Sequence, residues 1–191
     1  MSNPPVNSEE FNKAYKSIHH WFWTDIRIPK ELKNLIKNYN PKTSLELGCG
    51  LGNFSIFMAK QGVNATAIDF SPVAIERAKK RVENVNQKPL FLVGDVTNLE
   101  MLNEQYDISF DIGCFHCLDS DGHQKYAAEV YRLLQSGGIH LIWAMDDSPS
   151  QIPFNPDYIS DVFKDGFQLI ETKSSRRRIF AASHWYWLKR K

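Results

Sequence analysis

The stretch LELGCGLGNF, residues 45–54, decides the fold of this chain, because three alternating glycines follow directly on an apolar run. Residues 43–47 combine apolar and β-branched side chains and predict a strand. Phe54, Phe57 and Met58 then recur at helical spacing, so the period of the apolar pattern changes across the glycines. The sequence therefore predicts a strand, a tight glycine loop and a helix in succession.

Such a loop suits a nucleotide ligand. Glycine tolerates positive φ and has no Cβ, so the backbone can touch the ligand, and the N–H groups of the following helix point toward it. Dinucleotide sites use G-x-G-x-x-G. Here the third glycine, Gly52, comes one residue early, and Asn53 occupies the position that should be small. This spacing disfavours an NAD(P)-dependent oxidoreductase but leaves it open as an alternative.

Composition restricts the class of protein. A chain of 191 residues with 42% hydrophobic content suits one well-buried domain. The net charge of +1 disfavours a dedicated nucleic-acid binder. Residues 1–10 lack the apolar core of a signal peptide, and no run approaches the roughly 20 apolar residues of a membrane helix. With three cysteines and no disulfide framework, we expect a cytoplasmic protein without a membrane segment, as a monomer or homodimer.

The N-terminal part predicts helices. Aromatic and apolar side chains recur at helical spacing over residues 11–22, and we expect this face to cover the core. Trp23 and Arg27 follow in a dense aromatic and polar segment. Large aromatic rings can close the pocket of a cationic ligand by cation–π contact. Residues 1–40 are therefore interpreted as a helical lid on a core formed by residues 41–191.

A carboxylate follows the second predicted strand. Residues 63–68 predict a strand, and Asp69 comes about 20 residues after the glycine loop, where a carboxylate can accept hydrogen bonds from both hydroxyls of a ribose. Ser71 and Pro72 then cap and start the next helix.

The remaining pattern alternates strands with helices and ends in a hairpin. Further strands are predicted at residues 90–93, 107–112, 139–144, 167–172 and 179–188, with residues 136–138 ending a long helix before the fifth strand. This order predicts a single α/β domain over residues 1–191. Its fold is expected to be Rossmann-like and doubly wound, with a mostly parallel seven-stranded sheet, a C-terminal antiparallel hairpin and helices on both faces.

The run E-L-G-C-G-L-G, residues 46–52, resembles the first motif of the class I methyltransferases that use S-adenosylmethionine. The resemblance extends over about residues 20–190. It implies S-adenosylmethionine as the cofactor and an acidic residue that meets the adenine after the third strand. The implied cofactor-binding residues are Trp23, Arg27, Glu46, Gly48, Cys49, Gly50, Gly52, Asp69, Phe70, Ser71, Gly94, Asp95, Val96, Asp111 and Ile112.

Within this superfamily, residues 23–32 and 110–116 are similar to segments of the thiopurine, tellurite and halide/thiol methyltransferase group. The resemblance implies that the loop at residues 113–118 brackets the methionine part of the cofactor and the methyl acceptor. The expected partner is a small-molecule acceptor: a thiol, chalcogen oxyanion, amine or hydroxyl. Methyl transfer would be in line, with alignment of the reactants as the main contribution of the protein.

His116 is the candidate catalytic residue. An acceptor that must lose a proton needs a base, and imidazole titrates near neutrality. The alternative is that His116 packs against or orients the loop. A third functional alternative is a non-catalytic protein that binds S-adenosylmethionine.

Two other groups of residues are candidates for a metal or redox site. Cys114-x-x-Cys117 resembles half of a zinc or redox motif, without a second cysteine pair. Asp146 and Asp147, with Asp119, offer carboxylate oxygens that suit Mg²⁺, but we interpret them as solvated carboxylates at strand ends. We therefore expect no metal site.

Overall fold

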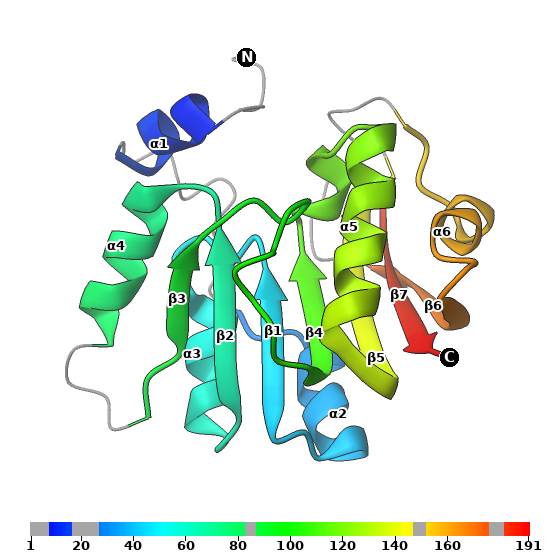
Figure 1. Cartoon of the computed structure of the whole chain (residues 1–191), viewed down its shortest axis with the longest axis horizontal. Helices are drawn as coiled ribbons and strands as arrows, with labels where there is room; N and C mark the ends of the chain where they lie inside the picture. Colours follow the sequence, from blue (N-terminus) through cyan, green and yellow to red (C-terminus); the bar gives the residue numbers. More distant parts are fainter. Residues whose placement is uncertain (1–7, 17–26, 83–86, 147–151, 176–181) are drawn as a thin grey trace. The chain divides into compact units, whose positions relative to one another are not determined.

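The structure, a computed structural model, describes residues 8–16, 27–82, 87–146, 152–175 and 182–191. The chain packs as two compact units, Met1–Gly94 and Asp95–Lys191 (Figure 1). That residues 1–191 act as a single methyltransferase domain, with residues 1–40 as a lid, stays a prediction.

The first unit is a parallel sheet with helices packed on it. Strand β2 (Asn64–Asp69) lies between β1 (Thr43–Leu47) and β3 (Leu90–Val93) and pairs with both in parallel. The helices of this unit are α1 (Ser8–Lys16), α2 (Lys30–Tyr39), α3 (Asn53–Lys60) and α4 (Pro72–Arg81). Because the strands are parallel, the glycine loop after β1 and the residues after β2 meet at one edge of the sheet.

Local sequence explains these elements. The side chain of Ser71 accepts a hydrogen bond from the N–H of Ala74, and Pro72 occupies the first turn, so α4 begins as predicted. Helix α3 packs on β1 and β2, and α4 packs on β2 and β3. A buried cluster fills the space between them: Cys49, Ala67, Ile75, Ala78, Val82 and Phe91.

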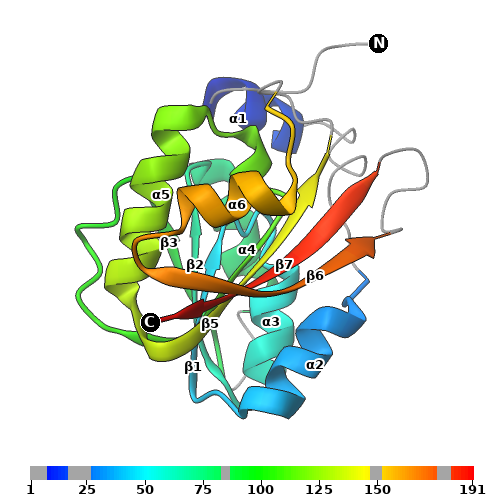
Figure 2. The same cartoon turned by 90° about the vertical axis from the view of Figure 1, so that its right-hand side faces the viewer.

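The second unit combines parallel and antiparallel pairing. Its strands lie in the order β4 (Tyr106–Ile112), β5 (Leu134–Met145), β7 (Ser183–Arg190) and β6 (Phe167–Ser175). Strands β4 and β5 are parallel, and β7 is antiparallel to both of its neighbours. Its helices are η2 (Phe115–Cys117), α5 (Ser120–Leu133) and α6 (Pro156–Val162), with α6 lying near β6 (Figure 2).

The start of β5 differs from the prediction. Residues 136–138 do not separate the helix from the strand, because α5 ends at Leu133 and β5 begins at Leu134. The register shifts there, since Tyr106 pairs with Leu134 but Ile108 pairs with Ile139. Gly137 has a φ of +77°, which the glycine backbone permits without strain, so the extra residues form an irregularity within the strand.

The predicted fold class is confirmed. The described strands number seven, with parallel pairing in β1–β2–β3 and β4–β5 and antiparallel pairing in β5–β7–β6. This is the mostly parallel Rossmann-like arrangement with a C-terminal hairpin. Among the helices of the described ranges, none combines the length and apolar character needed to cross a bilayer.

Candidate active site

The glycine loop has the conformation that its composition predicts. Gly48, Gly50 and Gly52 have φ values of +70°, +52° and +72°. A Cβ on Gly52 would lie 2.4 Å from the ring of Phe91, and a Cβ on Gly50 would lie 2.7 Å from the hydroxyl of Tyr15. The loop therefore requires glycine for its backbone angles and for close packing. The side chain of Cys49 is buried in the core cluster, so at this position the backbone is the part that can face a ligand.

Glu46 holds the loop to the helix that follows. Its buried carboxylate accepts hydrogen bonds from the N–H of Ser55, at 2.8 Å, and from the hydroxyl of Ser55. Because Ser55 lies in the first turn of α3, this contact positions the helix N-terminus above β1. The geometry assigns Glu46 a positioning role at the predicted cofactor loop.

Asp69 lies at the centre of the site in the first unit. One carboxylate oxygen accepts from the N–H of Gly50 at 2.7 Å, and the other accepts from the N–H of Ser71 at 2.9 Å. The N–H of Gly94 donates to the backbone carbonyl of Asp69 at 3.0 Å, which brings the end of β3 beside it. Burial raises the pKa of Asp69 from 3.8 to about 6, against the lowering effect of the two N–H donors. Each oxygen keeps a second lone pair for another donor.

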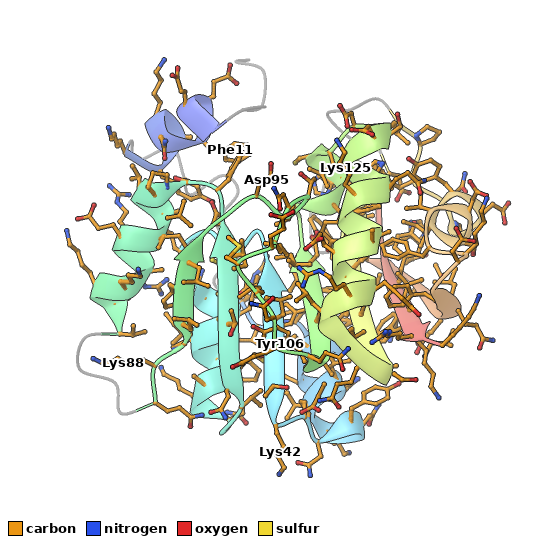
Figure 3. The ribbon with its side chains drawn as sticks, viewed as in Figure 1. Phe11, Lys42, Lys88, Asp95, Tyr106 and Lys125 are labelled. Carbon is orange, nitrogen blue, oxygen red and sulfur yellow. The ribbon has the colours of Figure 1, made fainter. Side chains whose placement is uncertain are left out.

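Helix α1, within the predicted lid, packs over the residues that surround Asp69. The ring of Phe11 packs edge-on against Phe70 at 5.2 Å between centroids, and the hydroxyl of Ser71 donates to the side-chain oxygen of Asn12 at 2.5 Å (Figure 3). Tyr15 is buried, with its hydroxyl beside Gly50. The face therefore contributes Tyr15 to the buried core, as expected, and also packs on the glycine loop and on the residues after β2. The i, i+4 spacing of Phe11 and Tyr15 indicated the face but not what it contacts.

Of the two predicted cofactor contacts in the lid, Trp23 and Arg27, the structure describes only Arg27. Trp23 lies outside the described residues, as does most of the second half of the predicted aromatic helix. Arg27 is described and exposed. A role for either side chain in cofactor binding stays a prediction.

Asp95 follows β3 at the start of the second unit. It is exposed, and one of its oxygens accepts from the N–H and the hydroxyl of Thr97 at 2.9 and 2.7 Å. The negative charge of Asp95 is one of the causes that raise the pKa of Lys125 on α5, after its larger contacts with Asp121 (Figure 3). Val96, the next residue, is buried. Asp95 therefore presents a carboxylate at the surface, as an adenine contact would require.

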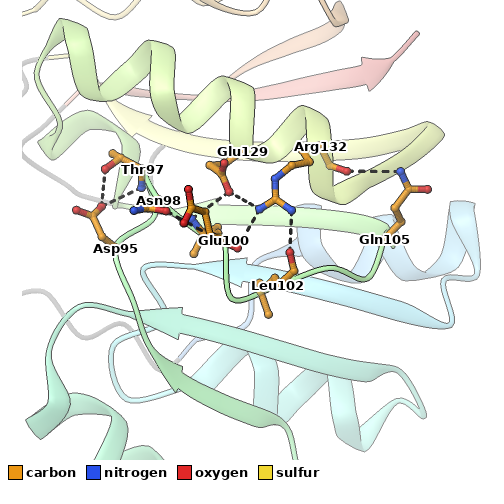
Figure 4. A network of polar contacts seen from close by, with 9 residues as sticks. Asp95, Thr97, Asn98, Glu100, Leu102, Gln105, Glu129 and Arg132 are labelled. Carbon is orange, nitrogen blue, oxygen red and sulfur yellow. Dashed lines mark hydrogen bonds and ion pairs between the residues drawn. The ribbon is translucent and has the colours of Figure 1, made fainter.

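A network on α5 holds the segment after Asp95 (Figure 4). The guanidinium of Arg132 donates to the carbonyls of Leu102 and Leu99 at 2.7 and 2.9 Å and pairs with Glu129 at 2.5 Å. The carboxylate of Glu129 also accepts from the N–H of Leu99 at 3.0 Å. Arg132 and Glu129 together thus hold the segment at Leu99 and Leu102, a few residues after Asp95, against α5.

We expect Arg132→Met to lower the free energy of unfolding by about 2 kcal/mol, because it removes two charge-assisted hydrogen bonds to backbone and leaves Glu129 without its cation. Urea unfolding followed by circular dichroism measures this change. Lys125→Met on the same helix is the control, since Lys125 pairs with Asp121 at the surface and such pairs contribute little. Equal losses in the two variants would contradict the role assigned to Arg132.

Asp111 accepts hydrogen bonds from its own loop, and its predicted role as a cofactor contact stays a prediction. It is fully buried and accepts from the N–H groups of Cys114 and Phe115 at 2.8 and 2.6 Å and from the hydroxyl of Tyr126 at 3.1 Å. Burial raises the pKa of Asp111 to about 7, although these donors lower it. Its three donors show that Asp111 shapes the loop at residues 113–117. Ile112 beside it is half-buried.

A buried hydrogen-bond chain continues from this carboxyl group. The hydroxyl of Tyr126 lies 3.1 Å from Nε2 of His140, and Nδ1 of His140 lies 2.8 Å from the hydroxyl of Ser109. Burial lowers the pKa of His140 to about 3, so the imidazole is neutral. The hydroxyl of Tyr126 donates to Asp111, so that these four side chains form one connected chain. This hydrogen-bond chain therefore connects Asp111, and with it the loop at residues 113–117, to buried side chains of β4, α5 and β5.

His116, the predicted base, is buried on this loop. Its exposed fraction is 3%, and its ring packs edge-on against Trp143 at 5.9 Å between centroids. This placement favours the alternative that His116 orients the loop. Neighbouring Cys117 has a pKa raised to about 12 by burial and the nearby charge of Asp111, so it is a thiol. Cys114 and Cys117 are both free of disulfides.

The carboxylates considered for Mg²⁺ have other partners. Asp119 caps α5 by accepting from the N–H of Gly122 at 2.8 Å, and Asp146 lies 2.8 Å from Nδ1 of His184. Asp147 falls outside the described residues. Within the ranges that the structure describes, no three His, Cys, Asp or Glu side chains gather in a way that would hold a metal ion.

Comparison with known proteins finds similarity to methyltransferases. Residues 45–138 match a family model described as a methyltransferase domain. The phthiotriol/phenolphthiotriol dimycocerosates methyltransferase of Mycobacterium leprae (strain TN) is 29% identical over 146 residues, which cover 75% of this chain and 48% of that protein. The chain therefore spans about half the length of this curated relative.

Solved structures share the fold. One, from work on the conversion of a disulfide bond into a thioacetal group during echinomycin biosynthesis, has a TM-score of 0.81 at 22% identity and covers 97% of this chain and 93% of its own. The N-methyltransferase NodS from Bradyrhizobium japonicum WM9, in complex with S-adenosyl-L-homocysteine, has a TM-score of 0.78 at 15% identity and covers 97% and 99%. Neither likeness separates the thiopurine and tellurite group from other methyltransferases.

Proposed function

We propose, from the premise that this chain belongs to the class I S-adenosylmethionine-dependent methyltransferases, that it transfers the methyl group of S-adenosylmethionine to a small-molecule acceptor. The acceptor is a thiol, chalcogen oxyanion, amine or hydroxyl. The observation that carries the proposal is the buried Asp69 carboxylate, held by the N–H of Gly50 beside a loop of positive-φ glycines.

The residues present fit this cofactor. Asp69 offers its remaining lone pairs to the two ribose hydroxyls, and the glycine loop has no Cβ that would block the approach of the ligand. Asp95 offers an exposed carboxylate for the adenine amino group. Tyr15, Phe11 and Asn12 on α1 cover the ribose end and exclude water from it.

Methyl transfer from a sulfonium depends mainly on the alignment of the methyl donor with the acceptor. The sulfonium supplies an already activated methyl group when the cofactor is bound. The protein binds the two reactants in line and keeps water away, and such orientation alone lowers a barrier by several kcal/mol. Glu46 and Asp111 serve this purpose by holding the loops after β1 and β4.

Calorimetric titration with S-adenosylhomocysteine tests the proposal, with NADH as the rival ligand. We expect micromolar binding of S-adenosylhomocysteine and none of NADH. Binding of NADH alone would instead support the dinucleotide alternative. Cofactor binding without methyl transfer to any thiol, oxyanion, amine or hydroxyl would support a non-catalytic binding protein.

The same titration should depend on pH. An ionised Asp69 accepts from the ribose hydroxyls, and its pKa is raised to about 6. The dissociation constant of S-adenosylhomocysteine should therefore be constant above about pH 7 and rise about tenfold per unit below about pH 6, as expected for the uptake of one proton.

The stability of the ligand-free protein should show the opposite dependence. The contribution of Asp69 is full below the unfolded pKa of 3.8 and is lost as the pH rises through about 6, because the folded state holds the proton more tightly. For the binding prediction above, an S-adenosylhomocysteine affinity that stays constant from pH 8 to pH 5 would contradict the assignment of Asp69 to the ribose.

A further inference from the structure

A histidine, a carboxylate and a hydroxyl lie together in the second unit, apart from the residues assigned above. Nδ1 of His184 lies 2.8 Å from Oδ1 of Asp146, and Nε2 of His184 lies 3.2 Å from the hydroxyl oxygen of Ser174. We refer to these three residues as the His184 cluster. It comes from three neighbouring strands, since Asp146 directly follows β5, His184 lies on β7 and Ser174 lies on β6.

Strand pairing positions the cluster. His184 is the register partner of Ser174 on β6 and of Ala144 on β5. The N–H of Asp146 donates to the carbonyl of Ala182 at 2.9 Å, which continues the β5–β7 ladder past the end of β5. β7 lies between β5 and β6 (Figure 2). Backbone hydrogen bonds between these strands therefore fix the positions from which the three side chains extend.

The contacts of the ring determine which nitrogen is basic. A carboxylate accepts but does not donate, so Nδ1 of His184 carries the proton toward Asp146. Nε2 then has its lone pair directed at the hydroxyl of Ser174, which donates to it. Orientation of an imidazole by a carboxylate is the arrangement that prepares the other nitrogen to take a proton.

The basic nitrogen can be reached from solvent. The side chains of His184 and Asp146 are 29% and 27% exposed, and Ser174 is exposed. Ser174 therefore occupies the position on Nε2 that the O–H or N–H group of a bound molecule would take. His116, by contrast, is 3% exposed.

The cluster lies at the strand ends where the loop after β4 begins. Ile112, the last residue of β4, pairs with Trp143 on β5, three residues before Asp146. The ring of Trp143 packs against His116, and its Nε1 donates to the hydroxyl of Ser175 at 3.0 Å, next to Ser174. Trp143 thus connects the loop predicted to bracket the acceptor with β6, from the sheet face opposite to the side chains of Ser174 and His184.

We propose that His184 is the catalytic base for a hydroxyl or amine acceptor and that Asp146 positions it. This inference rests on the proposed function and narrows its acceptor to a molecule that loses a proton on methylation. The lone pair of the acceptor oxygen or nitrogen forms the new bond to the methyl carbon, the carbon–sulfur bond breaks with its electron pair passing to sulfur, and the acceptor proton passes to Nε2 of His184. The resulting imidazolium pairs with Asp146 and releases the proton to water.

The side chain of Tyr186, which is also titratable, lies beside the cluster. The ring of Tyr186 lies 6.2 Å from that of His184. Burial, and to a lesser extent the charge of Asp146, raise the pKa of Tyr186 above its ordinary value, so it stays protonated and does not compete as a base.

The experiment uses labelled S-adenosylmethionine and a panel of phenols, aliphatic alcohols, amines and thiols. We expect the wild type to methylate at least one phenol, alcohol or amine, and His184→Gln to lower kcat for that acceptor by about 100-fold. Asp146→Asn should lower it by about tenfold. Thiols, which react as thiolates, should lose less than threefold. Lys173→Gln, an exposed neighbour of Ser174 on β6, is the matched control and should change none of these rates.

A second readout does not depend on turnover. In the ¹⁵N spectrum of histidine-labelled protein, the signal lost in His184→Gln identifies His184, and we expect its neutral form to carry the proton on Nδ1. Asp146→Asn should shift this proton toward Nε2, because the asparagine amide can donate to Nδ1. A tautomer that Asp146→Asn leaves unchanged would contradict the positioning role.

The outcomes separate this proposal from the proposed function. Failure of the wild type to bind S-adenosylhomocysteine would overturn both. Binding accompanied by methylation of thiols alone, or of no member of the panel, would overturn the His184 base while leaving a methyltransferase or a cofactor-binding protein. Equal kcat in the wild type and His184→Gln for an alcohol or amine would likewise overturn it, provided that S-adenosylhomocysteine binds both proteins equally.

Discussion

Asp69→Asn is expected to weaken S-adenosylhomocysteine binding by about 100-fold, which corresponds to about 3 kcal/mol. The carboxylate has two oxygens that accept from the N–H groups of Gly50 and Ser71 and can also accept from two ribose hydroxyls. An asparagine amide keeps one of these oxygens and directs an NH₂ group at a backbone donor. The substitution therefore disturbs the loop and removes a ligand contact together.

Calorimetric titration of the folded variant measures this loss. Glu76→Gln is the matched control, because it makes the same change of carboxylate to amide on the exposed surface of α4, where Glu76 forms an ion pair with Lys80. We expect that control to bind like the wild type. An Asp69→Asn protein with unchanged affinity would remove the main support for the proposed cofactor site.

Gly52→Ala is expected to lower the free energy of unfolding by about 3 kcal/mol. The φ of +72° costs an alanine about 1 kcal/mol, and the new Cβ would lie 2.4 Å from the ring of Phe91, which must move within a packed core. Phe91 is 2% exposed and belongs to the core cluster of the first unit, so its displacement affects α4 as well.

Gly62→Ala separates the two causes. Gly62 has a similar φ of +84°, but a Cβ there would meet nothing within 4 Å. Urea unfolding should therefore show a loss of about 1 kcal/mol for Gly62→Ala, which reflects the backbone angle alone. If both variants lose the same amount, the packing of Gly52 against Phe91 does not limit this position.

The sequence predicted the elements that depend on local pattern. The change from strand to helix period across the glycine loop, the N-cap at Ser71 and the position of Asp69 at the end of β2 are all confirmed. The start of β5 was misplaced, because Gly137 and Gly138 are typical of a helix end. They are also tolerated in an irregular strand, and the pairing with β4 decides between the two.

Side-chain roles were harder to predict than elements. Asp111 stands at a strand end, as a ligand contact would, yet three donors from Cys114, Phe115 and Tyr126 enclose it. Tyr15 shows the opposite case, since its helical spacing indicated core packing and its hydroxyl lies beside Gly50. The contacts of Tyr126 with Asp111 and of Tyr15 with Gly50 each depend on a helix that is distant along the chain.

By itself, the sequence determined the order of strands and helices, the need for glycine at Gly48, Gly50 and Gly52, and a carboxylate after β2, because period, backbone freedom and capping act over a few residues. Only the tertiary structure decided that α1 covers the loop after β1 and that His184 contacts Asp146, which lies 38 residues earlier in the chain. Such contacts depend on strand register and helix packing, which bring together side chains that no local pattern relates.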